Sequence, residues 1–143
     1  MFEGIIAMAK ACLENNIPVG LGTDTGCPYI THYDMWRELC YFVKYCGVTP
    51  GFALHSAPLG NAELANIAHE TGSIQPGKAA DMIVCAADPL ADLTALRSLD
   101  MVIKSGYRVE HPQVKKMDNV ERELDKQLVE KAHSDFSDKP PAK

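Results

Sequence analysis

The 143-residue sequence lacks the features that mark several classes of protein. Its longest apolar runs are far too short to span a bilayer, and its N-terminus carries Glu3 where a signal peptide would carry basic residues. Lys and Arg number 14 against 19 Asp and Glu, with no basic stripe, whereas phosphate binding relies on clustered basic side chains. We therefore expect a cytoplasmic protein that has neither a membrane nor a nucleic acid as its partner.

Cysteine pairs are also missing from the sequence. The five cysteines make an odd number, and none of them belongs to a C-x-x-C pair. A disulfide framework or a zinc knuckle would need such pairs. The sequence therefore predicts free and mostly buried thiols in a reducing cytosol.

The histidines do not have the spacing of a metal site. No H-x-H, H-x-x-x-H or H-E-x-x-H pair occurs among His32, His55, His69, His111 and His133. An ordinary zinc site takes at least three protein ligands, so the histidines do not assemble one by spacing alone. We expect His55 and His69 to be structural, on helices. The sequence also has no phosphate-binding glycine loop and no G-x-S-x-G motif.

The patterns that are present predict a globular mixture of helices and strands. Apolar residues spaced by three and four predict helices at 2–14, 33–46 and 119–132, the second with Gly47 as its C-cap, and a frayed tail is expected at 134–143. Shorter helices are expected at 50–57, started by Thr49 and Pro50, and at 61–69, capped by Asn61. Strands are expected at 17–22, 82–85, 101–104 and 107–109, the last two as a hairpin. A helix followed by the buried strand 17–22 indicates one unit of a parallel α/β layer.

Asp24 is the first candidate functional residue. It directly follows the predicted strand 17–22, and α/β barrels hold their catalytic groups at the carboxyl ends of buried strands. Gly22 and Gly26 on either side allow a tight turn that leaves room for a ligand. The structural alternative is that Asp24 only caps this turn through its carboxylate.

A third interpretation comes from the triplet Asp24-Thr25-Gly26, which is also found in aspartic proteases, where two such carboxylates share a proton. A chain with one triplet would have to dimerise to supply the pair. Those proteins are almost wholly β, whereas largely helical residues follow the triplet here. Gly22 and Thr23 also stand where bulky apolar residues would precede the aspartate.

Two stretches together resemble the amidohydrolase superfamily, particularly its imidazolonepropionase-like and prolidase-like members. The first is IPVGLGTDTG at 17–26, which resembles the eighth barrel strand of the family, ending in a metal-site aspartate. The second is GSIQPGKAADMIV at 72–84, continued by DPL at 88–90 and VIKSG at 102–106. The resemblance extends over residues 2–110. It departs from the family at Pro58, where a threonine is usual, and at residues 67–69, where the family has Leu-Gly.

This resemblance implies an α/β fold made of the C-terminal portion of a (β/α)8 TIM barrel and part of a small β-sandwich domain. Residues 1–71 would be the end of the barrel, residues 72–112 the C-terminal part of the β-sandwich, and residues 113–143 a helix and tail. The open strand edges of such a fragment would recruit a partner. That partner would be a second copy of the chain or the missing N-terminal half of the barrel.

The resemblance also implies a function, the hydrolysis of amide-type or cyclic amide C–N bonds in a small molecule by metal-activated water. One or two divalent ions, expected to be zinc, would be bound by Asp24, which would also accept the proton of the attacking water. His32 would contact the substrate, and Cys27 and Ser56 would line the pocket. The family's other ligands, including an H-x-H pair, are not in this sequence, so we expect the chain to be inactive alone. The alternative is a non-catalytic binding or oligomerisation remnant of the family.

Overall fold

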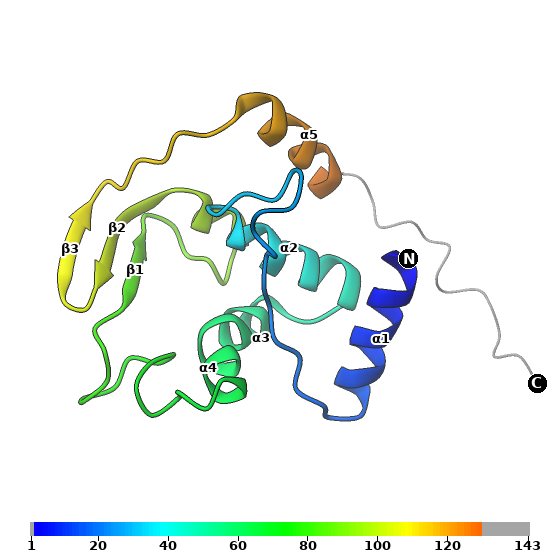
Figure 1. Ribbon diagram of the computed structural model, residues 1–143, viewed down its shortest axis with the longest axis horizontal. Helices are drawn as coiled ribbons and strands as arrows, with labels where there is room; N and C mark the ends of the chain where they lie inside the picture. The colour runs from blue at the N-terminus through cyan, green and yellow to red at the C-terminus, as the bar shows by residue number, and fades with distance from the viewer. Residues whose placement is uncertain (1, 130–143) are drawn as a thin grey trace, which may run out of the picture.

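The computed structural model describes residues 2–129, which form a helical part and a small antiparallel sheet (Figure 1). The helical part contains α1 (Phe2–Glu14), α2 (Met35–Cys46), α3 (Pro50–His55), the π-helical turn η1 (Ser56–Gly60) and α4 (Asn61–Leu64). The sheet contains β1 (Met82–Cys85), β2 (Leu99–Lys104) and β3 (Tyr107–Glu110), with the 3-10 helix η2 (Leu93–Arg97) before β2. Helix α5 (Asp118–Val129) follows the sheet. The predicted tail at 134–143 lies outside the described residues.

A core between α2, α3 and η2 organises the helical part. Its buried side chains are Leu39 and Phe42 from α2, Ala53 from α3 and Leu93 from η2. Gly47 ends α2 in the left-handed region, with φ of 75°, and its N–H donates to the Val43 carbonyl. This confirms the predicted C-cap, because glycine adopts that conformation without a steric penalty.

The two short helices predicted at 50–57 and 61–69 are in fact one continuous helical run, which differs from the prediction. The predicted start is confirmed, because the Thr49 hydroxyl accepts from the Phe52 N–H at 3.1 Å and Pro50 follows. The run widens into a π-helical turn at Pro58, whose ring has no N–H and cannot fit against a regular preceding turn. The helix ends near Leu64, before Asn66 turns left-handed at φ of 58°, and Asn61 lies inside the run rather than capping it.

The prediction of a β-strand at 17–22 is wrong, because these residues are not hydrogen-bonded into a sheet in the described structure. Residues 17–23, called the extended segment below, form neither a helix nor a turn, but no strand within residues 2–129 pairs with them, and their side chains are half-buried or exposed rather than buried. The Asn61 carboxamide pairs with Leu21 instead. The Leu21 N–H donates to Asn61 Oδ1 at 2.9 Å, and Asn61 Nδ2 donates to the Leu21 carbonyl at 2.8 Å. The parallel α/β layer is therefore not formed within the described part of the chain.

The sheet has the order β1-β2-β3, and both pairings are antiparallel. The predicted hairpin is confirmed, with Lys104 opposite Tyr107 and a turn at Ser105 and Gly106 in which both residues have positive φ. β2 starts two residues earlier than predicted. In the described part of the chain, the outer edges of β1 and β3 carry no further strand.

Helix α5 is attached to α2 by a buried network of charges. The Arg37 side chain is 3% exposed and contacts Asp34 of its own turn, together with Glu121 and Asp125 of α5. Arg97 of η2 reaches the same two carboxylates of α5, at 3.2 and 3.0 Å. Residues 118–129 thus agree with the predicted helix 119–132 over its described part. None of the helices within residues 2–129 has the length and hydrophobicity needed to cross a membrane.

The five cysteines all lie in the described part and are free thiols, as predicted. They are less buried than predicted, because Cys27 is exposed and the other four are half-buried. Burial raises the pKa of Cys40 and of Cys46, so these two thiols stay protonated at neutral pH.

Candidate functional site

Asp24 lies in an exposed loop with a constrained backbone. Its φ is 50°, in the left-handed region that few residues other than glycine, asparagine and aspartate occupy readily. The hydroxyls of Thr23 and Thr25 are hydrogen-bonded to each other at 2.7 Å, which joins the two residues on either side of Asp24. Gly26 follows with φ of 114°, a conformation that requires glycine. The loop therefore presents the Asp24 side chain to solvent in a defined turn.

A second carboxylate, Glu38 of α2, is close enough to Asp24 for their charges to interact. Burial raises the pKa of Glu38, and the negative charge of Asp24 raises it further. Desolvation and a like charge both disfavour the ionised carboxylate, so the two effects act in the same direction. The sequence contains no signal for Glu38, because no local spacing links a residue in the first turn of a helix to a loop 14 positions earlier.

Of the other predicted site residues, Cys27 donates its N–H to the Asp24 carbonyl at 3.4 Å, whereas Ser56 lines a pocket that Asp24 does not line. His32 is exposed, and its ring packs edge-to-face against Tyr33 with the centroids 5.2 Å apart. Cys27 is exposed in the same loop as Asp24, where it forms an isolated bridge with Thr25. Ser56 is buried in the π-helical turn and lines a different pocket. His55 and His69 are both exposed; His55 is on α3 as predicted, whereas the helix prediction is wrong for His69, which lies in a turn after α4.

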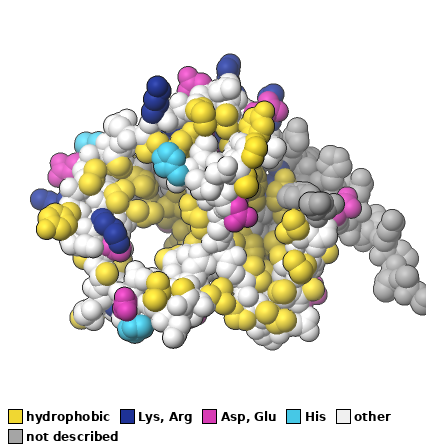
Figure 2. Space-filling model, in the orientation of Figure 1, with side chains coloured by type: hydrophobic (Ala, Val, Ile, Leu, Met, Phe, Trp, Pro, Cys, Tyr) yellow, Lys and Arg dark blue, Asp and Glu magenta, His cyan; other side chains and the backbone are white. Residues whose placement is uncertain are grey.

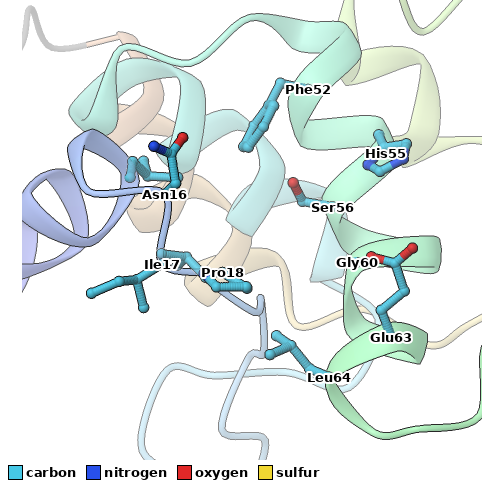
Figure 3. A pocket seen from close by; sticks show the side chains of 11 residues that line it. Asn16, Ile17, Pro18, Phe52, His55, Ser56, Gly60, Glu63 and Leu64 are labelled. Carbon is cyan, nitrogen blue, oxygen red and sulfur yellow. The ribbon is translucent and has the colours of Figure 1, made fainter.

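Ser56 faces a pocket of about 410 Å³ between the end of α1, the start of the extended segment and the run from α3 to α4 (Figure 3). Figure 3 shows Phe52, Ser56 and Leu64 directed toward the space beside Pro18, and His55 and Glu63 belong to the lining as well. Residues 16–19 line this pocket, and Asp24 does not. The pocket therefore adjoins the beginning of the extended segment, whereas the candidate catalytic carboxylate follows its end.

A larger cavity, of about 690 Å³, separates the helical part from the sheet. Its walls are mainly apolar, with Trp36 and Leu39 on the helical side and Val102 and Ile103 on the sheet. Asp81 and Lys104 add polar groups to the lining, and they form an ion pair at 2.5 Å. That ion pair and the Ser105 N–H lower the pKa of Asp81. Asp24 does not line this cavity either.

Residues 2–129 do not by themselves provide a binding site for a metal ion. No group of three or more His, Cys, Asp or Glu side chains in this range could hold one. Asp24 and Glu38 are two carboxylates, and three protein ligands are the usual minimum for a catalytic zinc site. The described residues therefore do not account for the metal expected from the sequence.

The sequence profile of the amidohydrolase family matches residues 3–109. The chain belongs to this family. The matched segment includes the Asp24 loop, the helical run and all of β1 and β2, so the resemblance found in the sequence is confirmed. Helix α5 lies outside the match.

Individual amidohydrolases support the same assignment. An imidazolonepropionase from Picrophilus torridus is 30% identical over 80 residues, which are 56% of this chain and 20% of that protein. A candidate prolidase from Bifidobacterium longum has a similar structure, with a TM-score of 0.81, 37% identity and coverage of 86% of this chain. A Xaa-Pro dipeptidase crystallised with methionine in its active site has a TM-score of 0.66 and 33% identity over 74% of this chain. The chain spans 30% and 25% of these two solved structures.

Proposed function

We propose that this chain supplies the Asp24 part of an active site that hydrolyses C–N bonds in small molecules. The observation that carries the proposal is the family match over residues 3–109, within which Asp24 is held in an exposed, left-handed loop. The relatives named above, an imidazolonepropionase and a Xaa-Pro dipeptidase, support a C–N bond as the target. The substrate would be a cyclic or acyclic amide.

In this proposal, the Asp24 carboxylate accepts a proton from the attacking water and returns it to the leaving nitrogen. A carboxylate performs this task best when its position is fixed and its proton affinity is near the working pH. The hydroxyl pair of Thr23 and Thr25 fixes the backbone on both sides. Glu38 lies close enough for the negative charge of Asp24 to raise the pKa of Glu38, so the site contains two interacting carboxylates. His32 would contact the substrate, and a divalent ion such as zinc would need ligands from outside the described residues.

We propose domain boundaries that coincide with the change from helices to strands along the chain. Residues 1–71 would be barrel elements, residues 72–112 part of a β-sandwich, and residues 113–143 a C-terminal extension. Figure 2 shows hydrophobic side chains spread over the visible face. On α1, Ile5 and Met8 are 57% and 63% exposed. Exposed apolar helix faces and open strand edges support a partner, either a second copy or the rest of a barrel.

A chimera tests the catalytic proposal. Residues 3–129 of this chain, with α5 included so that Arg37 keeps its partners, would replace the structurally matching segment of the Bifidobacterium longum protein, and hydrolysis of a Xaa-Pro dipeptide would be measured. We expect Asp24→Asn to lower kcat by about 100-fold or more, the usual contribution of a positioned acid–base group. Asp100→Asn, at an exposed position of β2, is the matched control and should leave kcat nearly unchanged. Equal activity of the two variants would refute the role of Asp24.

A second candidate function is a non-catalytic domain that binds or oligomerises. It is favoured by the lack of a metal-holding group in residues 2–129 and by the exposed apolar side chains. Sedimentation of the 143-residue chain over a range of concentrations addresses it. A monomer at every concentration, in a chain whose chimera is active, would reject this second function.

A further inference from the structure

The Asn61 side chain makes both polar contacts that a neighbouring β-strand would make with Leu21. Its Oδ1 accepts from the Leu21 N–H at 2.9 Å, and its Nδ2 donates to the Leu21 carbonyl at 2.8 Å. The two residues are 40 positions apart in the sequence. In an antiparallel ladder, a hydrogen-bonded pair of residues exchanges the same two bonds. The carboxamide thus replaces one rung of a ladder for a segment that has no strand partner in the described part of the chain.

The contact is tight as well as polar. A Cβ atom placed on Gly20 would lie 3.0 Å from Asn61 Oδ1 and 3.0 Å from Leu64 Cδ1. The absence of a side chain at Gly20 therefore lets the extended segment approach α4 closely enough for the carboxamide to reach Leu21. At Gly22, by contrast, an added Cβ would meet nothing within 4 Å. The close approach is local to the point where Asn61 binds.

Leu21, the residue that Asn61 binds, lies three residues before Asp24, and a hydrogen bond constrains the chain between them. Thr23 is half-buried, and its hydroxyl is bonded to that of Thr25 across the aspartate. In an extended chain, a slip by one residue moves every side chain to the opposite face. A contact that binds one residue at both its N–H and its carbonyl allows a single register. Fixing Leu21 therefore also fixes the side to which the Asp24 loop projects.

We propose that Asn61 is a positioning residue for Asp24, acting by setting the register of the extended segment from α4. The functional importance of Asn61 rests on the proposed role of Asp24. The structural effect of Asn61 on the Asp24 loop does not depend on that role. Asn61 touches no reacting atom in this proposal and acts through the backbone of Leu21.

The test uses NMR spectroscopy of the full 143-residue chain. Two quantities would be followed, the hydrogen-exchange rate of the Leu21 amide and the backbone chemical shifts of Asp24, which report its left-handed conformation. In Asn61→Ala we expect Leu21 to exchange about ten-fold faster, the equivalent of one lost hydrogen bond. The Asp24 shifts should move toward random-coil values while the Ala53 amide in the core keeps its exchange rate.

Two further variants sharpen the comparison. Asn61→Asp retains an acceptor for the Leu21 N–H but loses the donor, so both effects should be intermediate, and it replaces Asn61→Ala if that chain does not fold. Asn119→Ala, at an exposed position of α5, is the matched control and should change neither quantity.

Faster exchange at Leu21 with an unchanged Asp24 signal would show that Asn61 is only a structural anchor, and would overturn the proposal. An unprotected Leu21 amide in the unaltered chain would overturn it without any variant. If the Asp24 signal moves as expected but Asp24→Asn has no effect in the active chimera, positioning is upheld and the catalytic role of Asp24 is rejected. The two failures are therefore distinguishable.

Discussion

Replacing Arg37 by alanine should destabilise the chain by about 3 kcal/mol, the lower end of the cost of breaking a buried ion pair. The Arg37 side chain is 3% exposed and the Glu121 side chain 7% exposed, so both charges are out of bulk water. The two arginines and three carboxylates of this network carry a charge of 2 − 3 = −1, which becomes −2 without Arg37. We place the cost at the lower end because Arg97 still reaches Glu121.

The electrostatic environment of Arg37 favours its charged form. Burial alone would lower the pKa of Arg37, but the hydrogen bond to Asp125 and the charges of Asp34 and Glu121 raise it. The guanidinium group is therefore held in its charged form by its partners. It also lies over the Trp36 ring, 4.4 Å from the centroid, so truncation removes packing together with charge.

The assay is urea-induced unfolding, followed by Trp36 fluorescence. Arg97→Ala is the control, because the Arg97 side chain is 37% exposed and ion pairs of that kind contribute at most about 1 kcal/mol. A double replacement, Arg37→Met with Glu121→Leu, should be less destabilising than Arg37→Ala, since it leaves no uncompensated charge at Glu121. If Arg37→Ala costs no more than Arg97→Ala, the network does not hold α5 in the way described.

Three further outcomes follow from the same structure. Burial would raise the pKa of Asp125, but hydrogen bonds from Arg37 and Arg97 outweigh burial and lower this pKa. Asp125 therefore stabilises the fold above its unfolded-state pKa, and this stabilisation is lost as the pH falls through its folded-state pKa. Urea midpoints measured from pH 6 to pH 3 should show the loss. Asp24→Asn should lower the pKa of Glu38 in a carbon-13 NMR titration, because the replacement removes a repelling charge. An unchanged pKa of Glu38 would show that the two carboxylates do not interact. Gly20→Ala should cost about 1–3 kcal/mol by overpacking against α4, whereas Gly22→Ala should cost much less in the same unfolding assay, and equal costs would contradict the close approach.

Elements with local signals were predicted well from the sequence. Gly47 ends α2 because glycine tolerates the left-handed cap, and Thr49 with Pro50 starts α3 because each satisfies a rule of the helix N-terminus. The hairpin around Ser105 and Gly106 was predicted for the same reason. In each case the residues that decide the conformation are neighbours in the sequence, so a short stretch of sequence is enough to predict it.

The errors have the opposite origin. The segment 17–22 has strand composition, but a ladder needs a partner strand, and composition cannot show whether one is available. Asn61 has the chemistry of an N-cap, but its carboxamide is used 40 positions away by Leu21. Glu38 is near Asp24 only because α2 folds back on the loop. Asp24 itself was found because its context matches a family, and the proximity of Glu38 was not part of that pattern.

The attachment of α5 shows how far such non-local contacts extend beyond the recognisable family segment. The family match ends at residue 109, and α5 begins at Asp118. Yet Arg37, which lies inside the match and is almost fully buried, has two of its three carboxylate partners on α5. Without α5, Asp34 and solvent would have to satisfy a cation that the rest of α2 holds against Trp36. Helices α2 and α5 are therefore one energetic unit, and any shortened form of this chain that ends with the family match would expose Arg37.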